Sequence, residues 1–170
     1  MKAKAIPIQE WLEGLMEATQ ELLGTSLRFD RSQDGKKKNS AAEKAAKAAA
    51  AAEPQPGAYI AVLGEANAMH LGICSSQEGC RALARGLLGM RSDEALSDKD
   101  AMDGISEVMN IIAGKVKSRM ADRDHSLRLG MPIFMEQEIQ MRDNMERVKV
   151  DVSVGPVPCQ LLVFRMKKAA

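Results

Sequence analysis

The stretch DGISEVMNIIAG, residues 103–114, lies within the longest amphipathic helix that the sequence predicts, from about Asp98 to Met120. Apolar residues recur there every three or four positions, the spacing that places side chains on one face of an α-helix. This expected buried stripe consists of Met102, Ile105, Met109, Ile112, Val116 and Met120. We interpret the rest of the chain as a scaffold that displays this helix.

A second row of residues follows the same spacing about 100° further round the helix. It comprises Asp103, Glu107, Asn110, Gly114 and Lys117, and we call it the polar ridge. Glu107 and Asn110 stand on adjacent turns and are expected to point outward together. In mid-helix, Asn costs roughly half a kcal/mol and Gly about 1 kcal/mol relative to Ala. Helix stability alone does not explain these two residues, so the ridge predicts a docking surface.

The spacing Asp103-x3-Glu107-x2-Asn110, extended to Gly114, resembles the signature of the CheC, CheX and FliY family of chemotaxis phosphatases. A proline further along the chain belongs to that signature, and Pro132 stands at the corresponding place. The order of predicted elements from about residue 57 to residue 166 is also similar to the CheX branch. A single copy of the motif favours the CheX form over the two-site CheC form.

The resemblance implies a phosphatase that accelerates hydrolysis of the aspartyl phosphate on a CheY-like response-regulator receiver. Asn110 would orient the attacking water and Glu107 would pair with the receiver's active-site lysine, while Asp103 would flank the contact and Gly114 would let the two surfaces close. The protein would have no cofactor of its own, because the receiver would hold the Mg²⁺. The alternative is a non-catalytic module that uses the same helix to hold a receiver or a component of the flagellar switch. The resemblance also implies a homodimer formed by pairing sheet edges.

Composition limits the other classes of function. A chain of 170 residues with 45% hydrophobic residues is expected to form one domain, residues 1–170. The formal net charge of +1 and the aromatic share of 3% do not favour nucleic acid as a partner. No apolar run approaches the length of a membrane span, so we expect a cytoplasmic protein.

The cysteines and histidines do not form a recognisable catalytic or metal-binding pattern. Cys74, Cys80 and Cys159 lack C-x-x-C spacing, which favours reduced, partly buried thiols over a zinc site or a disulfide framework. His70 is expected on the outward face of a strand as a surface or edge residue, and His125 in a polar turn. No metal site and no Ser-His-Asp arrangement is predicted.

Two further helices are expected. An apolar face with helical spacing predicts the first from Ile8 to Leu23, ending at Gly24, with Trp11 as a core anchor. Ser75-x-x-Glu78 is typical of a capping box and opens the second, which Gly89 ends. We expect this second helix to cover the hairpin that precedes it.

Alternating or continuous apolar runs predict the strands, at 58–64, 67–74, 127–133, 148–154 and 161–164. The first two would form a hairpin, and Pro132 would place the third near an edge or a break. Residues 136–146 would form a loop or one helical turn. The predicted fold class is α+β, a largely antiparallel sheet with an N-terminal helix and two long helices packed on one face.

Residues 32–57 differ in composition from the rest of the chain. A lysine triplet at 36–38 leads into an alanine-rich run at 41–52 that cannot build a core of its own. We interpret 32–57 as an insert or linker, either a solvated loop or a marginal helix of about three turns. The lysines would be solvated or would steer an acidic partner. A short strand is expected around Leu27 and Phe29.

Overall fold

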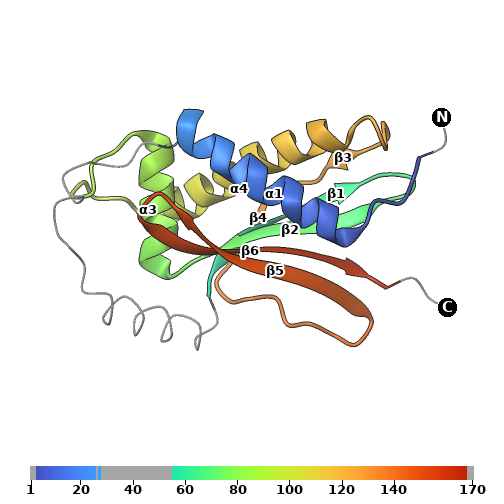
Figure 1. Ribbon diagram of the computed structural model, residues 1–170. Coiled ribbons are helices and arrows are strands. Elements are labelled where there is room, and N and C mark those ends of the chain that lie inside the picture. Colours follow the sequence, from blue (N-terminus) through green and yellow to red (C-terminus); the bar gives the residue numbers. More distant parts are fainter. Residues whose placement is uncertain (1–2, 26, 28–54, 168–170) are drawn as a thin grey trace.

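The computed structural model describes residues 3–25, 27 and 55–167, which form three helices and a six-stranded antiparallel sheet (Figure 1). The elements are α1 (Ile8–Thr25), β1 (Gly57–Leu63), β2 (Ala68–Cys74), α3 (Gln77–Leu88), α4 (Asp98–Met120), β3 (Arg128–Leu129), β4 (Ile133–Met135), β5 (Met145–Val154) and β6 (Val157–Met166). The strand order is β3-β1-β2-β6-β5, and β4 also pairs with β1. The predicted α+β class is therefore confirmed.

Most of the predicted insert, residues 32–57, lies outside the described residues, as does Phe29. The exception is its end. Gly57 already belongs to β1, where it pairs with Cys74 of β2. Its position leaves no room for a side chain, because an added Cβ would lie 2.4 Å from the backbone oxygen of Ile73.

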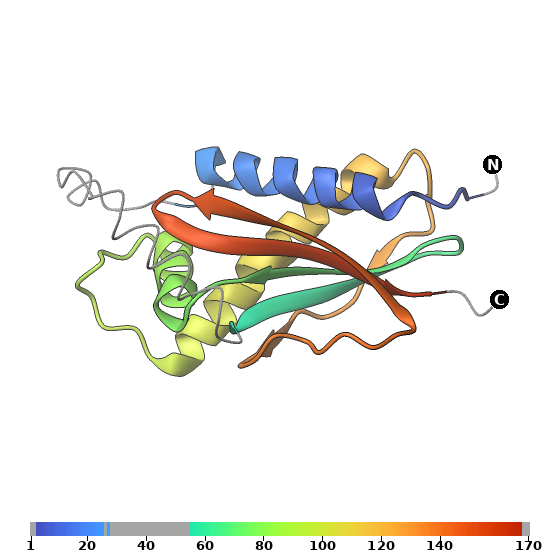
Figure 2. The same cartoon turned by 60° about the horizontal axis from the view of Figure 1, so that its bottom comes forward.

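The main core lies between the sheet and the helices, and Figure 2 shows α1 running along one side of the sheet. Alternate residues of the central strands point into this core, among them Ile60, Val62, Leu71, Ile73, Leu161 and Val163. Trp11 is fully buried and anchors α1, as predicted. Burying each large aliphatic side chain contributes about 1.5–3 kcal/mol, so this layer holds the helices in place.

The opposite face of the sheet carries a smaller cluster formed by Tyr59, Cys74, Leu162 and Phe164. Ile139 and Met141, from the segment between β4 and β5, pack against it. That segment is a loop, so the loop alternative for 136–146 is confirmed, although β5 already begins at Met145. The loop partly covers a sheet face that the helices leave open.

His70 lies on this outer face, as predicted, but it is not an edge residue. β2 stands between β1 and β6, and the His70 ring stacks on Phe164 with ring centroids 4.7 Å apart. Its Nδ1 is buried without a hydrogen-bond partner among the described residues, and burial lowers the pKa of the imidazole. A neutral histidine that stacks on Phe164 in this way has a structural role in the sheet rather than a catalytic one.

The predicted cap of α3 is displaced by one residue. Ser76 is the N-cap and its side chain accepts a hydrogen bond from the backbone N–H of Gly79. The hydroxyl of Ser75 instead donates to the backbone oxygen of Pro158 at 2.7 Å. Gly89 ends the helix in the left-handed conformation, φ 67°, as predicted.

The expectation that α3 covers the β1–β2 hairpin is wrong. It packs mainly against α4 and touches β6. The two helices approach closely at Gly104, where an added Cβ would lie 2.6 Å from the Cβ of Ala84. Leu88, the last residue of α3, is 54% exposed, so the end of this helix lies outside the contact with α4.

The predicted strands at 58–64, 67–74, 148–154 and 161–164 are confirmed with small shifts, whereas Leu27 lies in no strand. The run from 127 to 133 forms two short strands, β3 and β4, that are separated at Gly130–Pro132 and both pair with β1. Gly155 and Pro156 connect β5 to β6, and Gly155 has φ 60°. Positive φ followed by proline suits a two-residue hairpin turn, which fixes the register of the last two strands.

Candidate functional site

The helix that carries the polar ridge begins and ends where the sequence predicts. α4 spans Asp98–Met120, 23 residues, and the Ser97 side chain caps it by accepting a hydrogen bond from the Asp100 N–H. Most of the predicted stripe is buried, but Met102 is 38% exposed and is not part of the core. Gly104 lies against α3 on the buried side instead. Packed on both sides, α4 is a rigid support for its outward face.

The structure brings Glu107 and Asn110 together on that outward face. The Glu107 side chain is exposed and Asn110 is half-buried. The Asn110 amide donates a hydrogen bond to the Glu107 carboxylate over 3.4 Å, from Nδ2 to Oε2. A bond of this length is weak. It orients the amide without committing the Asn110 carbonyl or the second N–H of the amide.

The acids of the ridge are not neutralised by the protein itself. Among the described residues, neither Asp103 nor Glu107 has a basic side chain within ion-pair distance, and Asp103 is exposed. By contrast, Glu10, Glu17 and Glu21 of α1 are all paired with basic side chains of or near α4. The ridge therefore offers unpaired negative charge to a partner.

Gly114 is not required by the packing of the protein. A Cβ added there would meet no heavy atom within 4 Å. Its backbone oxygen accepts a hydrogen bond from the Ser118 hydroxyl at 3.0 Å. A mid-helix glycine with open space above it leaves the α4 backbone accessible at that point.

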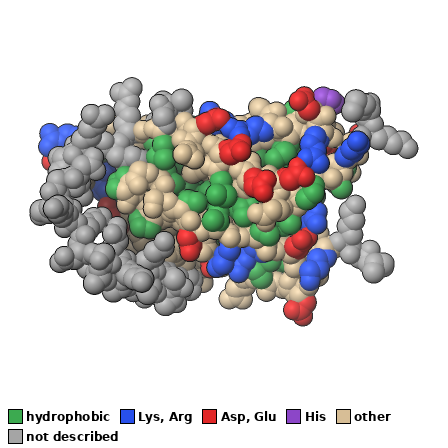
Figure 3. Space-filling view, in the orientation of Figure 1, with side chains coloured by type: hydrophobic (Ala, Val, Ile, Leu, Met, Phe, Trp, Pro, Cys, Tyr) green, Lys and Arg blue, Asp and Glu red, His purple; other side chains and the backbone are tan. Residues whose placement is uncertain are grey.

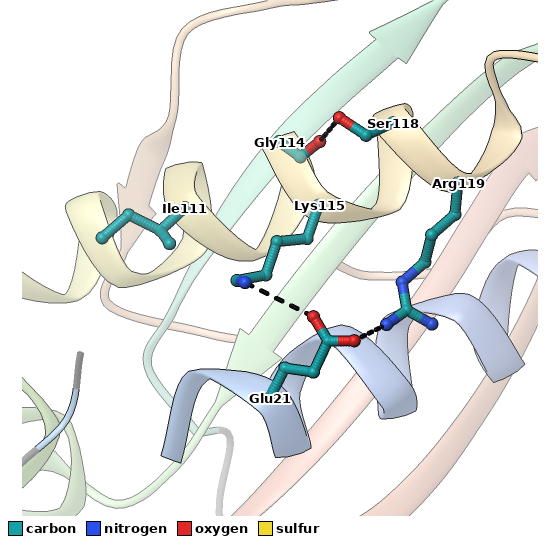
Figure 4. Close-up of a pocket in the computed structure, with 6 residues that line it drawn as sticks. All are labelled: Glu21, Ile111, Gly114, Lys115, Ser118 and Arg119. Carbon is teal, nitrogen blue, oxygen red and sulfur yellow. Dashed lines mark hydrogen bonds and ion pairs between the residues drawn. The ribbon is translucent and has the colours of Figure 1, made fainter. Parts of the chain in front are cut away.

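A groove opens beside Gly114, between α4 and the end of α1, with a volume of about 520 Å³ (Figure 4). We call it the α1–α4 groove; it is lined by Glu21, Ile111, Gly114, Lys115, Ser118 and Arg119. Glu21 lies 3.3 Å from the Lys115 ammonium and also pairs with Arg119, which in turn pairs with Glu17. This groove was not predicted. Its signal is present in the sequence, because acids at 17 and 21 match bases at 115 and 119 with the same four-residue spacing.

The buried thiols carry no reactive chemistry. Burial raises the pKa of Cys74 to about 11 and those of Cys80 and Cys159 to about 12. All three are free and buried. Thiols with such pKa values are protonated at neutral pH and are poor nucleophiles.

Asp124 is the one buried acid in the described part of the chain, and its role is structural. Burial by itself would raise the pKa of this carboxyl, but hydrogen bonds from Ser126 and Asn67 outweigh it and lower the pKa. Asn67 in turn accepts from the backbone N–H of Ile6 at 2.8 Å. The cluster ties together the N-terminal segment, the β1–β2 turn and the end of α4.

The described residues contain neither a metal-binding cluster nor a membrane-spanning helix. No group of three or more His, Cys, Asp or Glu side chains is placed to hold a metal ion. None of the described helices has the length and hydropathy needed to cross a bilayer. On the face of the molecule shown in Figure 3, acidic and basic side chains are interspersed.

Solved structures with the same fold come from chemotaxis proteins. CheX from Desulfovibrio desulfuricans is 16% identical, with TM-score 0.64 over 93% of this chain and 99% of its own. A putative chemotaxis protein from Desulfovibrio vulgaris Hildenborough is 17% identical, with TM-score 0.63 over 96% and 100%. CheX in a CheX–CheY–BeF3–Mg²⁺ complex from Borrelia burgdorferi is 15% identical, with TM-score 0.58 over 93% and 98%. No curated protein matches the sequence.

These chemotaxis proteins share the fold of this chain. The family model described as "Chemotaxis phosphatase CheX" matches residues 56–153, more than half of the chain and including all of α4. The chain belongs to the CheX family of chemotaxis phosphatases. The resemblance carried by the α4 motif is confirmed at the level of the family.

Proposed function

We propose that this protein hydrolyses the aspartyl phosphate of a CheY-type receiver, and that Asn110 and Glu107 complete the receiver's active site. The observation that carries the proposal is the position of the two side chains in a protein of this family. They stand on adjacent turns of α4, outside the core and without a strong internal partner. Side chains in that position are available to a second molecule.

Asn110 is suited to orient the attacking water. A phosphorylated receiver already holds its Mg²⁺ and the phosphoryl oxygens, so the missing element is a water in line with the phosphorus. A carboxamide has both donors and an acceptor, and it does not titrate. On docking, the 3.4 Å bond to Glu107 is easily replaced by bonds to water and to the phosphoryl group.

Glu107 is suited to fix the register of docking. It is exposed and without an ion pair among the described residues, so it can bind the receiver's active-site lysine through a charge-assisted hydrogen bond. Asp103 flanks that contact one turn earlier, and Gly114 lets the receiver approach the α4 backbone. The receiver supplies the Mg²⁺. The Borrelia burgdorferi CheX–CheY complex, which contains BeF3 and Mg²⁺, supports a receiver as the partner.

We also expect the protein to act in the cytoplasm, because response-regulator receivers act there.

The resemblance further supports a homodimer, and the sheet has a suitable edge for one. β5 is ten residues long and, in the part of the chain that the structure describes, pairs only with β6. Pairing of two β5 edges would place two polar ridges on one particle.

The decisive experiment measures phosphate release from the CheY-type receivers of the organism that makes this protein. Each receiver is first phosphorylated with a small-molecule phosphodonor. Catalytic amounts of the protein are added, and we expect many turnovers per molecule. Asn110→Ala is expected to lower the rate by about 10² to 10³ because one positioned group of the transition state is lost. Asn144→Ala makes the same substitution at an exposed position outside α4, and this matched control should keep the full rate.

The non-catalytic alternative makes a different prediction. A module that only holds a receiver would bind the phosphorylated receiver without multiple turnovers, and Asn110→Ala would then leave phosphate release unchanged. That result would reject the catalytic role of Asn110.

A further inference from the structure

The α1–α4 groove is continuous with the polar ridge. Gly114 belongs to both, and Ile111 also lines the groove (Figure 4). Ile111 follows Glu107 by one helical turn. Ile111 is half-buried and gives the groove an apolar floor. A molecule that docks on Glu107 and Asn110 therefore extends over this groove as well.

The ion pairs of the groove are arranged so that one cation can be released. Lys115 pairs with Glu21 alone among the described residues, whereas Glu21 also binds Arg119. Arg119 has a second anion, Glu17. If Lys115 turns away, Glu21 remains paired. Such solvent-exposed ion pairs contribute little to stability. The free-energy cost for Lys115 to exchange Glu21 for another carboxylate is therefore small.

The receiver's surface supplies the complementary charge. A pocket that holds Mg²⁺ is built from oxygen ligands, chiefly carboxylates, so the rim around a phosphorylation site is acidic. Lys115 lies five residues after Asn110, about 7.5 Å along the helix axis. It also lies about 140° round the helix from Asn110, on the flank that faces α1, so its flexible stem must extend past Gly114 to reach that rim.

We propose that the α1–α4 groove is the docking half of the site, where Lys115 exchanges Glu21 for a carboxylate on the rim of the receiver's phosphorylation pocket. This inference rests on the proposed function. It makes Lys115 a positioning residue that sets affinity for the receiver, and Glu21 an internal competitor for the same ammonium. The two residues therefore have opposite effects on binding although they form one ion pair.

The test compares three variants of the full chain in the phosphate-release assay. Lys115→Glu is expected to raise KM about tenfold with kcat within about twofold, because a like charge then faces the acidic rim. Glu21→Gln is expected to lower KM by about threefold, because Lys115 is no longer held within the protein. Lys4→Glu makes the same charge change on an exposed side chain of the N-terminal segment, outside the groove and the β5 edge, and should leave KM unchanged. Thermal melts followed by circular dichroism show that each variant is folded.

The outcomes separate this inference from the function on which it rests. If the parent protein turns over the receiver and Lys115→Glu has the parent's KM, the groove plays no part in docking while the proposed function stands. Equal rises in KM for Lys115→Glu and Lys4→Glu would also reject the groove, since net charge would be the cause. If the parent shows no turnover, the proposed function fails. The same variants are then titrated against the phosphorylated receiver, and equal affinities reject the groove as well.

Discussion

Two glycines of α4 look alike in the sequence but differ in what surrounds them. A Cβ at Gly114 would meet nothing within 4 Å, whereas one at Gly104 would lie 2.6 Å from the Cβ of Ala84. Helical periodicity places Gly104 near the buried side, but it does not show that α3 approaches there. A glycine at a position where the fold has room for a side chain indicates contact with a partner. A glycine at a helix crossing is instead required by the packing of the two helices.

This difference predicts stability changes of opposite sign. Gly114→Ala is expected to stabilise the protein by up to about 1 kcal/mol, the helix-propensity gain of Ala over Gly. Gly104→Ala is expected to destabilise it by about 1–2 kcal/mol, because overpacking at Ala84 exceeds that gain. Urea unfolding followed by circular dichroism measures both. Equal effects of the two substitutions would contradict the helix crossing described for α3 and α4.

Asp124 gives a prediction about pH. Hydrogen bonds from Ser126 and Asn67 lower the pKa of its carboxyl in the folded protein below the unfolded value. The stability that this group contributes is therefore present above the unfolded pKa, about 3.9, and is lost as the pH falls through the folded pKa. Asp124→Asn cannot titrate, so we expect its unfolding free energy to fall less steeply below about pH 4 than that of the parent. If the unfolding free energies of the two proteins fall in parallel with pH, Asp124 does not contribute this pH-dependent stability.

At the scale of elements, the boundaries of α4 and the strand pairing of β1 with β2 could be predicted because each rests on local periodicity. What each helix packs against could not. The sequence offers two adjacent serines before α3, and both can cap it. The hydroxyl of Ser75 is taken by the backbone oxygen of Pro158, a contact made by β6 from far along the chain. That tertiary contact leaves Ser76 as the cap.

The candidate site shows the same division. Glu107 and Asn110 could be found because the spacing of a single helix places them together. The α1–α4 groove combines Glu21 with Lys115, 94 residues apart in sequence, and depends on how two helices cross. Matching charges on two helices indicate that they can pair, but only the packing of α1 through its apolar face decides that they do.

Trp11 tests how firmly α1 is held beside the site. Its side chain is fully buried, so Trp11→Ala is expected to cost about 3–5 kcal/mol through the cavity that it leaves. Met16, on the same helix, is 39% exposed, and Met16→Ala should change stability by less than about 0.5 kcal/mol. Chemical unfolding measures both. Because α1 forms one wall of the groove, partial loosening by Trp11→Ala should also raise KM.

At the scale of the whole molecule, the two faces of the sheet serve different purposes. α1 and α4 cover one face, and α4 carries the polar ridge on its outward side. The loop before β5 partly covers the other face through Ile139 and Met141. The contacts proposed for the receiver all lie on the helical side, so the edges of the sheet remain available for a second copy of the chain.

The long edge of β5 makes the proposed homodimer testable strand by strand. In an antiparallel pair, alternate residues direct their N–H groups toward the partner strand, so in a single chain half of the β5 amides face β6 and the others face away. Dimerisation through β5 predicts a particle mass of twice 18.5 kDa by light scattering, with slow hydrogen exchange for both sets of amides. On dilution to the monomer, only the outward set should become fast. A monomeric mass would reject the dimer, and a dimer in which the outward amides stay fast would place its interface elsewhere.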